Sequence, residues 1–416
     1  MIMSARWLIL ADDLTGAADC AIAFAKHGLD AEVFWGEGKG GNAAVLSVDA
    51  DSRRSPPCEA AARQLKAQAV HWRPGMRLYK KIDSTIRGQP AAELAAQLKA
   101  LAAAGRAPLA VVSPAFPATG RSIIDGCVRV NDMPLEQTPL WARDHTYASA
   151  SLREVLASAD ISAEVIPLSV MRTGIDAVLA RMRKAERLGK GAVVCDSAAE
   201  TDLRVAADAS LKLSAAVWVG SAGLAAALAG LVAPRKPAAP PVATRSGAVL
   251  IVVGSLAESS RLQAKVLVES GRVVHLMVLP ETLLAGSQAP AWRSTGKSLI
   301  DALASGRDVL LEIALTEKLD LTRGASLAAN LAGLVGEAGT KIGALVATGG
   351  ETACALLNRL GIHGIRLIEE VEPGVPFGVG IGVRSLPVVT KAGAFGDPHT
   401  LRRCLDRLKE CRPSVG

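Results

Sequence analysis

The feature that most constrains the fold is a short apolar segment, residues 7–11, that runs directly into two aspartates and then an alanine-rich helical pattern. An uninterrupted apolar run of this length is typical of a strand buried on both faces of a sheet. Gly16 lies in the turn that leads into the helical pattern. In open α/β sheets ligands bind beyond the carboxyl ends of the strands, so Asp12 and Asp13 are predicted to lie where chemistry can occur.

Aspartates before a helix also have a purely structural explanation, because Asp often caps a helix N-terminus. One aspartate is enough for a cap, so this explanation accounts for one of the two residues and leaves the other. We therefore expect a functional role for at least one member of the pair Asp12 and Asp13.

The length and composition of the chain limit its architecture and its partners. At 416 residues, half of them hydrophobic, the chain is long enough for two or three domains of the usual size. Lys and Arg give a net charge of +7, but they are scattered, and only 3% of the residues are aromatic. These proportions favour a small anionic ligand over nucleic acid, which requires a basic surface and stacking side chains.

Cysteine usage and hydropathy indicate the compartment. The seven cysteines form no C-x-x-C pair and are odd in number, which is typical of reduced thiols in a cytoplasm. The first strand follows directly after Arg6, without the apolar core and cleavage site of a signal peptide. No apolar run approaches the roughly 18 residues of a membrane span. We therefore predict a cytoplasmic protein without a membrane partner.

Strand and helix patterns alternate through the first half of the chain, which predicts a mostly parallel sheet. Residues 31–35 and 44–48 are the next two strand candidates, and residues 58–70 have helical periodicity. Asp51 and Arg53 follow the second of these strands and would share one edge of the sheet with the two aspartates. An arginine on a loop is often only solvated, so Arg53 by itself indicates little.

The densest polar cluster of the chain spans residues 80–89, at the end of another strand candidate. Its lysine, arginine and hydroxyl side chains can together hold a carboxylate or phosphate and the hydroxyl groups of a sugar. The structural explanation is a capped helix start with its charges in solvent. That explanation accounts for the serine and for the proline that opens the helix, but not for Lys81, Asp83 and Arg87 together.

Composition changes abruptly after residue 232, where residues 234–241 contain four prolines. Such a segment cannot continue a helix and is typical of an extended linker. We predict a first domain over residues 1–232, a linker over 233–247 and a second domain over 248–416. Both domains are expected to be α/β, with mostly parallel sheets.

In the second half, three turns place glycine after a strand candidate: residues 254–255, 348–352 and 391–398. In the second of these turns, a strand leads through two glycines into a helix. Bare amides and the helix dipole favour an anion such as phosphate in this geometry. The third turn includes a cation, Lys391. Paired glycines are common in turns, so the pattern is not specific by itself.

These motifs occur in the order found in the four-carbon acid sugar kinase family, which the chain resembles over nearly its full length. The six matching motifs are residues 11–17, 80–88, 254–255, 349–352, 372–376 and 391–396. Gln89 is a mild departure, because many members have Asn there. The resemblance implies a substrate-binding first domain, a nucleotide-binding second domain and an active site in the interdomain cleft.

The resemblance further implies that ATP is the co-substrate, with Mg²⁺, and that D-threonate, D-erythronate or 3-oxo-tetronate is phosphorylated. The residues predicted for the acid-sugar site include six from the matching motifs: Asp12, Lys81, Ile82, Asp83, Ser84 and Arg87. Arg53 is added to them because it is a cation at the same edge of the sheet. Those matched to the ATP site are Ser255, Gly349, Gly350, Glu351, Thr352, Lys391, Gly393 and Gly396. The metal ligands stay unassigned, and a homodimer is a further expectation.

Two other classes of function compete with a kinase. The chain could be a non-enzymatic sugar-acid sensor whose second domain responds to nucleotide, although a sensor does not need two glycine-rich turns and Lys391. A nicotinamide-dependent dehydrogenase would need a G-x-G-x-x-G motif between a strand and a helix, and the sequence has none.

The general base of the kinase is predicted to be one of the adjacent aspartates, Asp12 or Asp13. If both carboxylates face the same edge of the sheet, their like charges should raise the proton affinity of one of them. Asp83 should instead have a lowered pKa because of its basic neighbours, which suits a sugar ligand better than a base. Asp397, in the last glycine-rich loop, is the first alternative.

Overall fold

The computed structural model describes residues 6–36, 40–232, 247–255, 257–315, 323–393 and 395–411, without the side chain of Arg143. Proximity of Cα atoms divides the chain into two compact units, Met1–Ala238 and Ala239–Gly416. All of the predicted linker except Gly247 lies outside the described residues, as does Ala394 in the third glycine-rich turn. The predicted domain boundaries and interdomain cleft therefore stay predictions.

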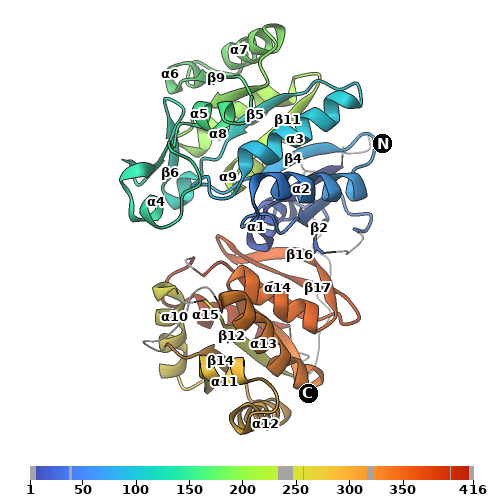
Figure 1. Ribbon diagram of the computed structural model, residues 1–416, viewed down its shortest axis with the longest axis vertical. Coiled ribbons are helices and arrows are strands. Elements are labelled where there is room, and N and C mark those ends of the chain that lie inside the picture. Colours follow the sequence, from blue (N-terminus) through green and yellow to red (C-terminus); the bar gives the residue numbers. More distant parts are fainter. Residues whose placement is uncertain are drawn as a thin grey trace. The chain divides into compact units, whose positions relative to one another are not determined.

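The described part of unit 1 contains a sheet of eight parallel strands (Figure 1). In spatial order they are β2 (Ala31–Trp35), β3 (Val45–Asp49), β1 (Trp7–Ala11), β4 (Arg77–Lys81), β11 (Ala216–Gly220), β5 (Leu109–Ser113), β10 (Ala192–Cys195) and β9 (Ala163–Ile166). Nearly all of their residues are buried, as expected for parallel strands covered on both faces.

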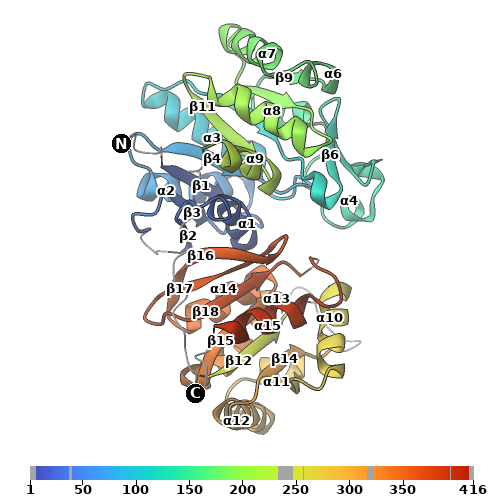
Figure 2. The same ribbon diagram turned by 180° about the vertical axis from the view of Figure 1, so that it is seen from behind.

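Helices cover both faces of this sheet (Figures 1 and 2). One face carries α2 (Pro57–His71) and α3 (Pro90–Ala103), and the other carries α1 (Leu14–Ala25), α9 (Ala222–Val232), α8 (Glu200–Leu211) and α7 (Ile175–Arg187). Proline opens both α2 and α3, where its fixed φ favours the first helical turn. Aromatic residues pack together in this unit's core, where the ring centre of Trp7 lies 5.2 Å from that of Phe24 and 5.0 Å from that of Trp218.

A small antiparallel sheet follows β5. It consists of β6 (Arg121–Ile124), β7 (Cys127–Val130) and β8 (Met133–Pro134) and is followed by α4 (Pro139–Arg143), α5 (Leu152–Ala157) and α6 (Leu168–Met171). Buried Asp196, after β10, accepts hydrogen bonds from the amides of Asp125 and Gly126 and so fixes the β6–β7 turn to the main sheet.

Unit 2 is a second α/β layer structure with a mixed sheet. Its strands are, in spatial order, β13 (Val274–Val278), β14 (Val309–Ile313), β12 (Ala248–Val253), β15 (Ile342–Thr348), β18 (Pro387–Lys391), β17 (Val375–Gly382) and β16 (Ile362–Glu372). The first five are parallel, and β17 and β16 form an antiparallel hairpin. The predicted class of two α/β domains with mostly parallel sheets is confirmed.

Helices cover both faces of the unit 2 sheet as well (Figures 1 and 2). One face carries α10 (Glu258–Glu269) and α15 (Thr400–Glu410), and the other carries α11 (Pro280–Ala285), α12 (Pro290–Ala304), α13 (Gly324–Glu337) and α14 (Gly350–Arg359). The motif at residues 372–376 forms the turn of the β16–β17 hairpin. Among the described residues, no helix is both long and apolar enough to cross a membrane.

The strand order places a topological switch point in each unit. In unit 1, β1 lies between β3 and β4, so the chain leaves it first to one side of the sheet and later to the other. In unit 2, β12 lies between β14 and β15 in the same way. Ligands of open α/β sheets bind beyond the carboxyl ends of the strands at such points. The segments that follow β1 and β12 are residues 12–13 and 254–255, two of the predicted motifs.

Candidate functional site

The centre of the unit 1 site is Arg53, which binds both aspartates after β1. Its Nε and Nη2 donate to the two oxygens of Asp12, each at 2.8 Å. Its Nη1 and Nη2 donate to the two oxygens of Asp13 at 2.6 and 2.9 Å. Arg53 reaches this position because its own amide and that of Ser52 both donate to the carbonyl of Asp12 at 3.1 Å. The turn after β1 thus turns both carboxylates toward one cation.

Asp13 also has the structural role that the sequence allowed for one aspartate. It is the N-cap of α1, and its Oδ1 accepts a hydrogen bond of 2.9 Å from the amide of Gly16. Its Oδ2 accepts a further bond of 2.7 Å from the Thr15 hydroxyl. Asp12 has no cap function and is almost fully buried, with 3% of its surface exposed.

Gly16 and Gly88, two glycines of the matching motifs, lie so close to charged side chains of the site that a Cβ atom would not fit. A Cβ on Gly16 would lie 2.5 Å from both Asp13 Oδ1 and Lys81 Nζ. Gly88 has a φ of +81°, and a Cβ there would lie 2.9 Å from Asp12 Oδ2. The glycines therefore let the charged side chains pack directly against main chain, which any larger residue would prevent.

Lys81 is the cation of this site whose N–H donors have no protein partner among the described residues. It is 5% exposed, and its ammonium makes no hydrogen bond or ion pair within 4 Å to a residue that the structure describes. Burial by itself would lower the pKa of Lys81, but the charges of Asp13 and Asp12 raise it, so the lysine stays protonated. Arg53 and Arg87, by contrast, are paired with carboxylates.

Asp83 forms a bidentate pair with Arg87, with Nη2 and Nε at 2.8 and 2.9 Å from its two oxygens. Burial opposes ionisation of Asp83, but Arg87, Arg53 and Lys81 outweigh it and hold its pKa well below the usual range. The lowered pKa of Asp83 is as predicted. The turn is tight, because Ile86 has a φ of +53°, a conformation that typically costs a β-branched residue about 1–3 kcal/mol.

A buried polar network, which the sequence analysis missed, supports the Arg53 loop from the α2–α3 face. Lys80 Nζ lies 2.6 Å from Glu93 Oε2, with both side chains at most 1% exposed. Ser52 donates to Glu93 Oε1 at 2.6 Å, and Gln64 donates to the Ser52 hydroxyl at 3.0 Å. Strand alternation explains why the adjacent lysines diverge: Lys80 faces α3, whereas Lys81 faces α1. In the sequence, this network is indicated only by a glutamine in α2, Gln64, and a glutamate in α3, Glu93.

We predicted a raised pKa for Asp12 or Asp13, but the aspartate with a strongly raised pKa is Asp49. Burial raises the pKa of Asp12, but Arg53, Lys81 and Lys80 more than compensate, so the pKa is lowered and the expectation was wrong for this residue. Asp49, at the end of β3, has its pKa raised to about 8 by burial and by the charges of Asp13, Asp51 and Asp12. The sequence patterns did not single out Asp49.

In unit 2 the three glycine-rich turns converge beyond the carboxyl ends of β12, β15 and β18. The amide of Gly349 donates to the carbonyl of Lys391 at 2.8 Å. A Cβ on Gly393 would lie 2.0 Å from Ser255 Oγ, and a Cβ on Gly254 would lie 2.1 Å from Thr352 Oγ1. Gly350 is the first residue of α14, and Gly349 is its N-cap. The predicted ATP-site residues therefore pack closely together, which the glycines allow because they carry no Cβ.

Lys391 lies beneath the last of these turns rather than at its surface. It is 1% exposed, and its ammonium donates to the carbonyls of Phe395, Ala392 and Gly393 at 2.9, 3.0 and 3.3 Å. Burial lowers its pKa to about 8, while Cys404 and Glu372 oppose the shift. Ser259 and Ser260 of α10 donate to the same Gly393 carbonyl. These donors draw the carbonyls of the turn inward.

The other predicted residues have simpler surroundings. Ile82 is buried and has an apolar side chain. Its amide already donates to the carbonyl of Gly220, so Ile82 has no free hydrogen-bond donor for a substrate. Ser84 is half-buried beside Asp83. Glu351 lies in the first turn of α14. Asp397 is exposed and pairs with Arg403 at 2.8 Å just before α15, so it has a turn role.

The residues present fit a magnesium ion that is held mainly by phosphate and water. Among the described residues, no group of three or more His, Cys, Asp or Glu side chains could hold a metal by itself. Mg²⁺ in phosphoryl-transfer sites is usually bound through substrate phosphates, water and only one or two carboxylates. Glu351, beside the paired glycines, is the carboxylate of unit 2 in that position.

Fold and site together define an α/β protein of two compact units, with a cluster of charged side chains in one and glycine-rich turns beside a helix N-terminus in the other. Comparison with known families agrees with this division. Residues 7–228 match the family described as "Sugar-binding N-terminal domain", and residues 250–401 match "Nucleotide-binding C-terminal domain". The chain belongs to the four-carbon acid sugar kinase family.

Curated relatives extend over the whole chain. A D-threonate kinase of Cupriavidus necator is 41% identical over 415 residues, covering 98% of this chain and 99% of the relative. A D-erythronate kinase of Heliobacterium modesticaldum is 31% identical, covering 96% of each chain. A solved structure from Salmonella typhimurium superposes with a TM-score of 0.82 over 97% of this chain and 99% of that chain. At 21% identity this last similarity shows the fold alone.

Proposed function

We propose that this protein is an ATP-dependent kinase that phosphorylates the terminal hydroxyl of a four-carbon acid sugar, such as D-threonate, D-erythronate or 3-oxo-tetronate. The observation that carries the proposal is that a buried lysine that is unpaired among the described residues, Lys81, and a buried carboxylate, Asp12, both lie at the switch point of a sugar-binding domain. An acid sugar presents the two complementary groups, a carboxylate and hydroxyls. The full-length similarity to D-threonate and D-erythronate kinases supports the same substrate class.

Lys81 is the residue that we assign to the substrate carboxylate. Arg53 and Arg87 are neutralised by Asp12, Asp13 and Asp83, whereas Lys81 has no partner within ion-pair distance among the described residues. A cation held buried and protonated by distant carboxylates binds an incoming anion without first breaking a salt bridge. Arg53 and Arg87 then position the aspartates around the hydroxyl groups.

Asp12 is the residue that we assign as general base. Each oxygen of Asp13 already accepts two hydrogen bonds, from Arg53 and from Thr15 or Gly16. Each oxygen of Asp12 accepts only one side-chain bond, so a lone pair remains on each for a substrate hydroxyl. The low pKa of Asp12 keeps it ionised, and it accepts the proton as the hydroxyl attacks the γ-phosphorus.

We further propose that ATP binds to unit 2 through main-chain amides. The Lys391 ammonium holds the carbonyls of Ala392, Gly393 and Phe395 inward, and the α10 serines bind that of Gly393, so that the opposite side of the turn can face phosphate oxygens. The N-terminus of α14 adds its dipole at Gly349 and Gly350. Mg²⁺, when bound with the nucleotide, would neutralise phosphate charge, with Glu351 as its protein ligand.

A coupled assay of ADP release over D-threonate, D-erythronate, 3-oxo-tetronate and longer aldonates tests this proposal. We expect turnover with at least one four-carbon acid and little with five- or six-carbon acids. Product analysis should place the phosphate on the terminal oxygen. Binding of an acid without ADP release under any condition would contradict the kinase and favour a non-enzymatic sugar-acid sensor.

A further inference from the structure

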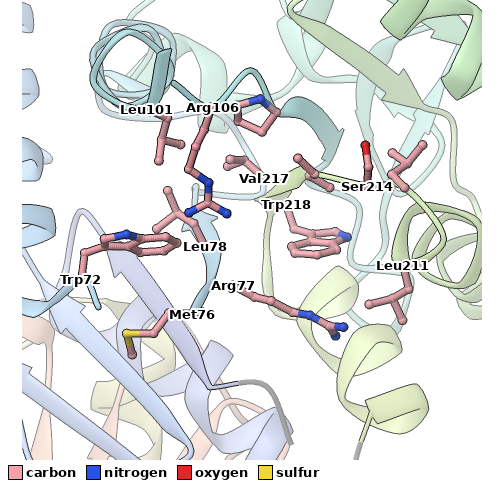
Figure 3. A pocket seen from close by; sticks show the side chains of 14 residues that line it. Trp72, Met76, Arg77, Leu78, Leu101, Arg106, Leu211, Ser214, Val217 and Trp218 are labelled. Atoms are coloured by element: carbon pink, nitrogen blue, oxygen red, sulfur yellow. The ribbon is translucent and has the colours of Figure 1, made fainter. Parts of the chain in front are cut away.

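A second cavity lies at the opposite edge of the unit 1 sheet, at the amino ends of β4, β11 and β5. It has a volume of about 140 Å³ and is formed by the loops that follow α2, α3 and α8. Its floor is apolar, with Leu78 and Val217 among the lining residues, and Trp72 and Trp218 form part of its wall (Figure 3). Arg77 and Lys81 are the first and last residues of β4, so the cavity and the proposed substrate site lie at opposite ends of one strand.

Two arginines give this cavity its chemical character. The guanidinium of Arg106 lies 5.4 Å from the ring centre of Trp72, and that of Arg77 lies 5.4 and 5.9 Å from Trp7 and Trp218. In Figure 3 the Arg106 side chain reaches into the space between Trp72 and Trp218. No aspartate or glutamate is among the described residues that line the cavity.

The arginines are not satisfied by the protein around them. Neither side chain donates a hydrogen bond to, or forms an ion pair with, a described residue, although each guanidinium has five N–H donors. Burial lowers the pKa of Arg77, and no nearby carboxylate offsets that shift. Arg77 is half-buried and Arg106 is exposed, but both guanidiniums lie against indole rings. This contact preorganises them, because less side-chain entropy remains to be lost when an anion binds.

We propose that this cavity is a binding site for a small oxyanion, a carboxylate or phosphate group, separate from the substrate and nucleotide sites. The guanidiniums supply the charge-assisted donors, and the tryptophan rings hold them in place and restrict the size of the ligand. The rival explanation is that the arginines only offset the carbonyl ends of α2, α3 and α8, which reach the same edge. Anion binding distinguishes the two.

The experiment is a fluorescence and calorimetric titration of the full-length protein with inorganic phosphate and, separately, with acetate, at constant ionic strength. We expect a saturable signal from the tryptophans of the cavity, and the more effective anion identifies the ligand group. An excess of ADP should leave the signal unchanged, because ADP occupies the other unit. Trp72→Phe should remove much of the fluorescence change but leave the calorimetric binding.

Arg106→Gln is the decisive variant, because Arg106 is exposed and its replacement leaves the core intact. Loss of a charge-assisted hydrogen-bond pair should weaken binding by about tenfold or more. Arg153→Gln, which removes an equally exposed charge on α5, should bind like the unchanged protein. The absence of saturable binding, or equal affinity of Arg106→Gln and Arg153→Gln, would overturn the proposal in favour of the helix-end explanation.

Discussion

The two units contain their candidate sites at equivalent places in similar sheets, yet they build them from different parts of the chain. In unit 1 the site consists of charged side chains, with Arg53 between Asp12 and Asp13. In unit 2 it consists of glycine-rich turns that include Gly349 and Gly393, and the buried Lys391 binds carbonyls instead of facing outward.

The difference follows from the groups that each unit is proposed to bind. A four-carbon acid is distinguished from other acids by the positions of its hydroxyls and carboxylate, so side chains with fixed donors and acceptors are required. A polyphosphate presents many equivalent oxygens, for which a row of amides and a helix N-terminus is sufficient. Conservative side-chain changes should therefore be most damaging in unit 1, and added Cβ atoms in unit 2.

The largest effect is expected for Asp12→Asn, which changes a proton acceptor but keeps its shape. Loss of the general base should lower kcat by roughly 10²–10⁴-fold, with ATP affinity unchanged. Asp13→Asn should have a smaller effect, because Asn is an equally good N-cap. Steady-state kinetics and nucleotide calorimetry measure both. If both variants keep near-normal kcat, the base lies elsewhere and Asp397 is the next residue to replace.

Gly393→Val tests the main-chain site of unit 2. Its side chain would collide with Ser255, since even a Cβ would lie 2.0 Å from that hydroxyl oxygen. The turn must then move, and loss of two or more amide bonds to phosphate should weaken ATP binding by about 100-fold or more. Binding of the acid should be unaffected. Gly333→Ala, inside α13 with only ordinary contacts, is the matched control. Unchanged nucleotide affinity in calorimetry of Gly393→Val would disprove the assignment.

Lys81→Met tests the carboxylate assignment in unit 1. Removing one charged hydrogen bond should raise the KM for the acid by roughly 10–100-fold and leave the KM for ATP unchanged. Lys99→Met removes an exposed lysine of α3 and controls for net charge. If Lys81→Met leaves the KM for the acid unchanged and Arg53→Lys raises it, the carboxylate is bound by Arg53 instead.

The smallest effects are opposite pH dependences of stability in the two units. Asp49 has a pKa of about 8 in the folded protein and an ordinary value of 3.8, so it stabilises the fold at low pH and loses this contribution as the pH rises to 8. Lys391 has a pKa of about 8 in the folded protein and an ordinary value of 10.5, so the folded state binds this proton more weakly than the unfolded state. The free energy of unfolding therefore increases as the pH rises from 8 to 10.5.

Urea unfolding across these two pH windows, compared with Asp49→Asn and Lys391→Met, measures the two contributions. From pH 4 to pH 8, the free energy of unfolding of the unchanged protein should fall relative to that of Asp49→Asn. Above pH 8, the free energy of unfolding of the unchanged protein should rise relative to that of Lys391→Met. A parallel pH profile of variant and unchanged protein would show that the corresponding group does not titrate abnormally.

Local patterns in the sequence determined most of the architecture. Apolar runs such as residues 7–11 predict buried parallel strands, because only a doubly covered strand is apolar on both faces. The same patterns placed Asp12, Arg53, Lys81 and Asp83 at strand ends.

Only the tertiary structure decided which of two adjacent, chemically identical residues contributes to the site. Lys80 and Lys81 are equivalent in sequence, but the pleat directs one to Glu93 and the other to the aspartates. The high proton affinity of Asp49 depends on burial and on charges from other strands, so no local motif encodes it. Arg53 reaches Asp12 across 41 residues, because β3 pairs with β1. Interactions over such distances depend on strand order, which a linear pattern does not contain.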